Sequence, residues 1–126
     1  ATVAFMLDRH PDEVEPVLGS FYLEYDNTQL TYDTTELGAS AVEAGRKSVF
    51  ASPVNPTTIR ANITSSNLVG MGSGALLLVH FDRVGDGPYV FTVDTENTTL
   101  SPAAARVGQT FGAGHPNEPL VLEGGM

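Results

Sequence analysis

The feature of this sequence that most constrains its fold is the alternation of apolar and polar residues over short segments. It is clearest in residues 75–82, where Ala75, Leu77, Val79 and Phe81 fall on one face of an extended chain. Gly, Pro, Asn, Asp, Ser and Thr separate the alternating segments at short intervals, and these residues are typical of turns. Because successive side chains of a strand point to opposite faces, the pattern predicts many short strands. We therefore expect an all-β domain with little helix, either a β-sandwich or a jelly roll.

The expected strands fall into a clear group and a weak group. The clear group comprises residues 2–7, 20–25, 29–33, 59–64, 75–82 and 89–94, and the weak group comprises 48–51, 105–110 and 120–122. Helix-forming composition is confined to residues 39–47, where Gly45 limits the helix to one short turn. The segment from residue 112 onward is rich in Gly and Pro, so we expect its end to be a linker or a frayed terminus.

The same alternation predicts which side chains form the core. On each strand the apolar set should face inward, and a register slip of one residue would expose the whole set. The expected core residues are Phe21, Leu23, Ala61, Ile63, Leu77, Val79, Phe81 and Phe91. Leu76, Leu78 and His80 alternate to the opposite face of their strand, where the two leucines would form an exposed apolar patch.

Length and charge exclude several classes of protein. The chain has 126 residues, enough for one domain that buries a core without disulfides or a metal. It carries 15 acidic and 6 basic residues, a net charge of −9, which disfavours nucleic acid and anionic lipid as partners. The absence of cysteine excludes thiolate zinc sites, thiol nucleophiles and disulfides. The longest apolar run, residues 75–79, is too short for membrane insertion. We expect residues 1–126 to be a single domain, excised from a longer protein or processed to this form.

The motifs that suggest catalysis lack the context that catalysis needs. Residues 70–75 (GMGSGA) match a loose dinucleotide-binding fingerprint, but no strand–helix unit surrounds them, so we interpret them as a glycine loop between two strands. The histidines are dispersed at His10, His80 and His115, and Ser73 does not lie in a nucleophile elbow. We expect no enzymatic activity and no cofactor.

Two loops are rich in carboxylates. One carries Asp12, Glu13 and Glu15, and the other carries Asp82 and Asp86. Neither loop has the ligand spacing of a calcium-binding EF-hand. We interpret both as solvated acidic surface and expect no metal site, although oxygens from several loops together could still hold calcium.

Residues 20–30 (SFYLEYDNTQL) resemble the cohesin signature, in which an alternating strand ends in Tyr-Asp and a short turn leads to a Leu that opens the next strand. Asp26 can hold this turn by accepting a hydrogen bond from the backbone two residues on, and Leu30 then returns to the core. Residues 72–81 (GSGALLLVHF) are similar to the cohesin strand in which a glycine precedes alternating apolar residues and a final Phe. Residues 2–7 and 89–94 match the first and eighth cohesin strands in the correct order.

This resemblance implies a nine-stranded jelly-roll sandwich and a non-catalytic function. Cohesins bind dockerin modules of other proteins and so assemble complexes outside the cell or on its surface. They use the flat face of strands three, five, six and eight. Mapped here, the outward positions of that face are Ser20, Tyr22, Glu24, Arg60, Asn62, Thr64, Thr92 and Asp94. The cellulosomal type carries Asn and Asp where this chain has Leu18 and Ser20, so the resemblance is to a divergent, non-cellulosomal member.

Two other functions fit an all-β domain of this composition. The first is a carbohydrate-binding sandwich with a polysaccharide partner, for which Tyr22 is the best outward-facing aromatic and Trp is absent. The second is a structural spacer in a larger surface protein. Binding to candidate dockerins, compared with binding to a glycan array, would discriminate between the protein-binding and the carbohydrate-binding function.

Overall fold

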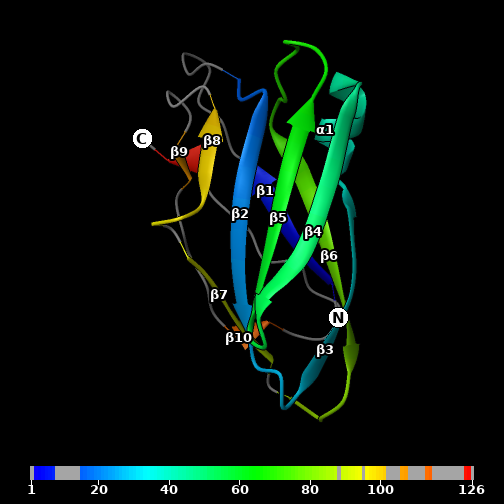
Figure 1. The fold of residues 1–126 in the computed structure, drawn as a ribbon, viewed down its shortest axis with the longest axis vertical. Coiled ribbons are helices and arrows are strands. Elements are labelled where there is room, and N and C mark those ends of the chain that lie inside the picture. Colours follow the sequence, from blue (N-terminus) through cyan, green and yellow to red (C-terminus); the bar gives the residue numbers. More distant parts are fainter. Residues whose placement is uncertain are drawn as a thin grey trace.

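A computed structural model describes residues 2–7, 15–87, 89–94 and 96–101, together with two-residue strands at 106–107, 113–114 and 124–125. Two antiparallel sheets pack face to face and form a β-sandwich (Figure 1). The first sheet has the order β1 (Thr2–Leu7), β6 (Gly74–Arg83) and β3 (Leu30–Leu37). The second has the order β10 (Ala113–Gly114), β7 (Tyr89–Val93), β2 (Leu18–Tyr25), β5 (Thr58–Ser65) and β4 (Lys47–Asn55).

The remaining strands are short. β8 (Thr99–Ser101) pairs with the start of β2, while β7 pairs with its end. β9 (Arg106–Val107) pairs with β11 (Gly124–Gly125) in a ladder of its own. The described part of the chain thus contains eight strands of three residues or more, close to the nine expected, and the jelly-roll sandwich class is confirmed.

The predicted strands are mostly correct in place but too short. The predicted strand 2–7 is confirmed with its exact bounds. In contrast, β3, β4 and β6 extend beyond their predicted ranges, which were 29–33, 48–51 and 75–82 respectively. Helix α1 (Ala39–Ala44) is the one helix of the described residues, and it ends where Gly45 adopts a φ of +74°. It is too short to cross a membrane. The weak strand 105–110 is described only at 106–107, and 120–122 lies outside the described residues.

The core lies between the two sheets and contains all eight predicted residues, each at most 4% exposed. Aromatic rings join the two layers. Phe5 of β1 meets Phe21 of β2 with ring centroids 5.2 Å apart, and Phe81 of β6 meets Phe91 of β7 at 5.4 Å. Because each buried phenyl ring contributes roughly 1.5–3 kcal/mol, these pairs fix the sheets against each other.

The expected outward position of Leu76 is wrong. Leu76 is 2% exposed and belongs to the same core cluster as Leu77. Phe5 pairs with Leu77 and Met6 with Ala75, so Leu76 is the extra residue of a β-bulge. A bulge breaks the two-residue period locally, which allows two successive side chains to be buried. Leu78 is only partly buried, so the expected apolar patch is reduced to one leucine.

Two local predictions about loops are confirmed. Asp26 Oδ1 accepts hydrogen bonds from the Thr28 N–H at 2.9 Å and the Thr28 hydroxyl at 2.6 Å, which holds the β2–β3 turn, and Leu30 is buried after it. Residues 70–73 belong to the loop that connects β5 to β6, and Gly74 and Ala75 begin β6, so the segment is a glycine-containing loop between two strands and not a strand-to-helix turn.

Candidate protein-binding face

The outward side chains of β7, β2, β5 and β4 form one open surface, which we call the outer face. In Figure 1 no described segment crosses in front of β2, β5 and β4. The structure brings together on this side all eight residues singled out in the sequence, namely Ser20, Tyr22, Glu24, Arg60, Asn62, Thr64, Thr92 and Asp94. Their contact with a partner stays a prediction.

Strand pairing arranges the outer face in rows. In one row Ser20 lies opposite Asn62, and its hydroxyl donates to Asn62 Oδ1 at 2.7 Å. In the next row Tyr22 lies opposite Arg60. Further along β2, Glu24 lies opposite Thr92 of β7. The centre of the face is therefore polar, with one basic side chain.

The most exposed aromatic ring on the outer face was not predicted from the sequence. Phe50 of β4 lies opposite Asn62 and is 76% exposed. It was missed because residues 48–51 were identified only as a weak strand and were given no face. The available signal was the alternation of Val49 and Ala51, which pack against the core, with Phe50 between them. The ring adds exposed apolar area to an otherwise polar face.

A buried lysine fixes β4, the strand that carries Phe50. Lys47 is 8% exposed, and its ammonium donates to Ser65 Oγ at 2.8 Å, Asn67 Oδ1 at 3.0 Å and the Val69 carbonyl at 2.6 Å. All three acceptors are neutral, and burial lowers the pKa of Lys47 from its usual 10.5. These bonds tie the start of β4 to the β5–β6 loop, so the edge strand is held in place.

Asp94 shapes one edge of the outer face. Its carboxylate accepts hydrogen bonds from the backbone N–H groups of Glu96 and Asn97 and from the Asn97 amide at 2.7 Å. The hydrogen bond from the Asn97 side chain is the main cause that lowers the pKa of Asp94. The Asp94 carboxylate therefore bonds within its own turn. Its position at the edge of the outer face agrees with the position predicted from the sequence.

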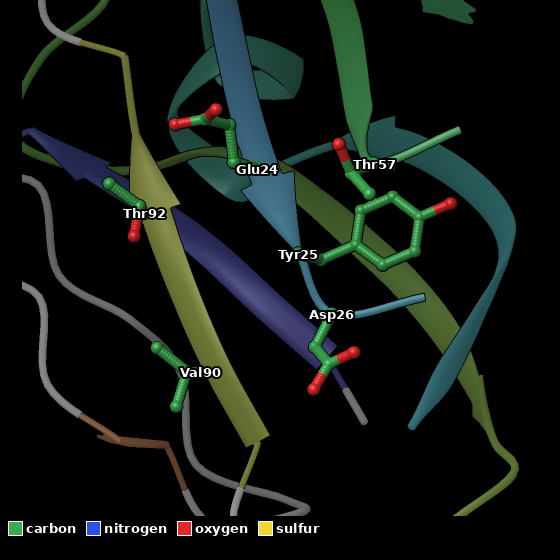
Figure 2. Close-up of a pocket in the computed structure, with 6 residues that line it drawn as sticks. All are labelled: Glu24, Tyr25, Asp26, Thr57, Val90 and Thr92. Atoms are coloured by element: carbon green, nitrogen blue, oxygen red, sulfur yellow. The ribbon is translucent and has the colours of Figure 1, made fainter. Parts of the chain in front are cut away.

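A recess of about 310 Å³ opens at the end of β2 (Figure 2). The residues that line it are Glu24, Tyr25, Asp26, Thr57, Val90 and Thr92. Glu24 and Thr92 were predicted as site residues, whereas the other four were not. Burial raises the pKa of Tyr25, and the hydrogen bonds from Thr28 lower the pKa of Asp26. The recess therefore combines a phenol with two acidic side chains.

The described residues hold no group of three or more His, Cys, Asp or Glu side chains that could bind a metal ion. In the first acidic loop, residues 12 and 13 lie outside the described part of the chain. In the second, Asp82 at the end of β6 and Asp86 in the β6–β7 loop are both exposed. The outer face offers hydrogen-bonding groups and the rings of Tyr22 and Phe50.

No protein-family model matches the chain, and no curated protein matches its sequence. Solved structures do match its fold. The cohesin module of a family 33 glycoside hydrolase from Clostridium perfringens has a TM-score of 0.62 at 13% identity, with 92% of this chain and 79% of that chain covered. A non-cellulosomal cohesin from the archaeon Archaeoglobus fulgidus has a TM-score of 0.56 at 12% identity, covering 97% and 87%.

A third similar structure is the third cohesin of ScaC from Acetivibrio cellulolyticus, solved in complex with the ScaB dockerin. Its TM-score is 0.56 at 9% identity, with 98% of this chain and 96% of that chain covered. These likenesses confirm that the chain has the cohesin fold, as the resemblance in residues 20–30 and 72–81 implied. The outward positions that this resemblance implied lie on β2, β5 and β7, with Asp94 directly after β7.

Proposed function

We propose that this chain is a non-catalytic module that binds a second protein through the outer face, and that the partner carries a dockerin. The complex would assemble proteins outside the cell or on its surface. The observation that carries the proposal is the fold. Its solved relatives are cohesins, and three of them are described as complexes with dockerins.

The composition of the outer face supports the same proposal. Tyr22 and Arg60 lie side by side at its centre, and Tyr and Arg are enriched among the residues that dominate protein interfaces. Phe50 adds an exposed ring two strands away from Tyr22. The opposite sheet offers less apolar surface, since Leu76 is buried there.

The test is a binding screen of the purified chain against a panel of dockerin modules, with a glycan array in parallel. For a dockerin that binds, Tyr22→Ala and Arg60→Ala should each weaken the complex by about 1 kcal/mol or more. Arg83→Ala is the matched control, because Arg83 is exposed at the end of β6 on the other sheet. Equal losses from Arg60→Ala and Arg83→Ala would contradict the outer face as the interface, and binding to glycans alone would contradict a dockerin partner.

A further inference from the structure

Strand β4 forms a free edge of the larger sheet (Figure 1). It pairs with β5 on one side, and no described strand pairs with its other side. The pairing with β5 is regular from Lys47 to Pro53, and the register shifts only between Pro53 and Asn55. An edge strand presents a row of unpaired backbone N–H and C=O groups, which another strand can complete. β4 is therefore a place where the sheet can be extended.

Two hydrogen bonds of Tyr22 establish the direction of the backbone groups across the sheet. The Tyr22 carbonyl accepts from the Asp94 N–H at 3.0 Å, and the Tyr22 N–H donates to Thr98 Oγ1 at 3.0 Å. Both groups of Tyr22 therefore point away from β5. Arg60 lies opposite Tyr22, so the pair is a non-hydrogen-bonded one, and the Arg60 backbone groups point toward β4.

The same alternation identifies the backbone groups on the free edge of β4. Ser52 lies opposite Arg60, so its N–H and C=O point toward β5. The backbone groups of Val49 and Ala51 then point the other way, to the free edge, and no described residue forms a hydrogen bond with them. Pro53 also belongs to this outward set, so its missing N–H takes no hydrogen bond from the β4–β5 ladder.

The free edge of β4 lacks the charges that usually protect an edge strand. Residues 48–52 (SVFAS) include no charged side chain. In contrast, the edge strand β3 of the other sheet carries exposed Asp33 and Glu36, and its pairing with β6 contains a register shift. Charges and bulges both hinder the pairing of an edge with another chain. Because the whole chain has a net charge of −9, a second copy would meet the least repulsion along an uncharged edge such as this one.

The sequence of this edge is complementary to itself. In an antiparallel pairing about a two-fold axis at Phe50, Val49 of one copy lies opposite Ala51 of the second copy, and their outward N–H and C=O groups bond to each other. The two Phe50 residues then form a non-hydrogen-bonded pair with Cα atoms about 4.5 Å apart. Phe50 is 76% exposed in the single chain, and an aromatic pair across two strands covers part of both rings.

We infer that the free edge of β4 binds a second copy of this chain, so that two chains form one continuous antiparallel sheet about a two-fold axis at Phe50. This axis is perpendicular to the sheet, so the outer faces of both copies point the same way. Tyr22 and Arg60 stay open, because the new strand lies beside β4 and covers neither β2 nor β5. The dimer presents two outer faces side by side, and its formation does not depend on the proposed dockerin partner.

The first experiment tests the pairing by disulfide cross-linking, since the chain itself contains no cysteine. Phe50→Cys places two thiols at the axis, where the Cα separation permits a disulfide. Ser48→Cys is the matched control, because it is exposed on the same strand but its two copies lie roughly 13 Å apart along the ladder. In a glutathione redox buffer we expect about tenfold more covalent dimer from Phe50→Cys than from Ser48→Cys. Equal cross-linking of the two variants would overturn the inference.

A double variant keeps the phenyl ring in place. Ser48→Cys/Ser52→Cys retains Phe50, and the two-fold pairing brings each substituted position opposite the other one on the second copy. We expect this variant to form a covalent dimer as readily as Phe50→Cys does. Cross-linking no greater than that of Ser48→Cys alone would contradict the pairing about Phe50.

The second experiment measures association of the unmodified chain by sedimentation. In 1 M NaCl, where charge repulsion is screened, we expect the average mass to rise toward that of a dimer between roughly 10 μM and 1 mM. Phe50→Glu opposes two carboxylates at the axis and should remain monomeric. Leu68→Glu adds the same charge at a loop position that is 91% exposed, and it should associate like the parent.

Three results would overturn the inference. The parent could remain monomeric over the whole range, or Phe50→Glu could associate as well as Leu68→Glu. In the third, the parent remains monomeric but the Val49 and Ala51 amides become protected from hydrogen exchange when a dockerin is added, which would assign the edge to a different partner.

Discussion

The outward surfaces of the two sheets are built on different principles. On the three-stranded sheet, Thr2 Oγ1 and Glu36 Oε1 both contact the ring of His80, at 3.0 Å and 3.4 Å, so side-chain contacts link β1, β6 and β3. Helix α1 packs beside β6 and adds Ala41 to the core between the sheets. On the outer face the Ser20–Asn62 hydrogen bond crosses β2 and β5, but Phe50 stays open. On the three-stranded sheet these polar side chains bind one another, whereas the outer face leaves apolar area and charged side chains that a partner can cover.

The largest expected effect separates buried from open aromatic rings. Phe81→Ala should cost roughly 3–5 kcal/mol of unfolding free energy, because the ring packs against Tyr25, Tyr32 and Phe91 between the sheets. Phe50→Ala should change it by no more than about 0.5 kcal/mol, since that ring is exposed. Urea denaturation of both variants measures the contrast. Similar costs for the two variants would mean that the assignment of inner and outer faces is wrong.

A second prediction tests which leucine of β6 is buried in the core. Leu76→Ala should cost about 2–5 kcal/mol, because the bulge places this side chain in the core. Leu78→Ala should cost clearly less, since Leu78 is only partly buried on the outward side. The same denaturation assay applies. If the two costs were reversed, the register of β6 would have no bulge and the sheet would expose Leu76.

The third prediction concerns binding by the outer face. Phe50→Ala should weaken the binding of a dockerin by about 2 kcal/mol, or roughly thirtyfold, because truncating an exposed aromatic side chain within the interface removes a large contact area that the partner desolvates. Leu68→Ala is the matched control, since Leu68 is 91% exposed in the β5–β6 loop, away from the sheet. Isothermal titration calorimetry measures both. A loss at Leu68 and not at Phe50 would move the interface to the loop end of the sandwich.

The smallest effect is a pH dependence at the edge of the outer face. Hydrogen bonds lower the pKa of Asp94 below 3.8 in the folded chain, so its ionised form stabilises the fold above that pH. This stabilisation is lost as the pH falls from 3.8 through the folded pKa. The gap in melting temperature between the parent and Asp94→Asn should therefore be present at neutral pH and close in acid. A gap that persists in acid would show that Asp94 acts without its charge.

Sequence patterning predicted the sandwich because burial enforces a two-residue period wherever a strand has one solvated face. It failed at Leu76, where a bulge inserts one residue and no local signal marks it. It missed Phe50 because residues 49–51 are all apolar, so the sequence shows no alternation there that would assign a face. Sequence patterning could not predict the recess, because Val90 and Thr57 approach Asp26 only after β7 and β5 have paired with β2.

The central claim is that the outer face, and not the three-stranded sheet, binds the partner. The most direct measurement is NMR mapping of the labelled chain on addition of a saturating dockerin. The account predicts that amide shifts and cross-saturation concentrate on β2, β4, β5 and β7, and that the strongest effects include Tyr22, Phe50 and Arg60. Effects concentrated on β1, β3 and β6 or on helix α1, with the outer face unchanged, would contradict it.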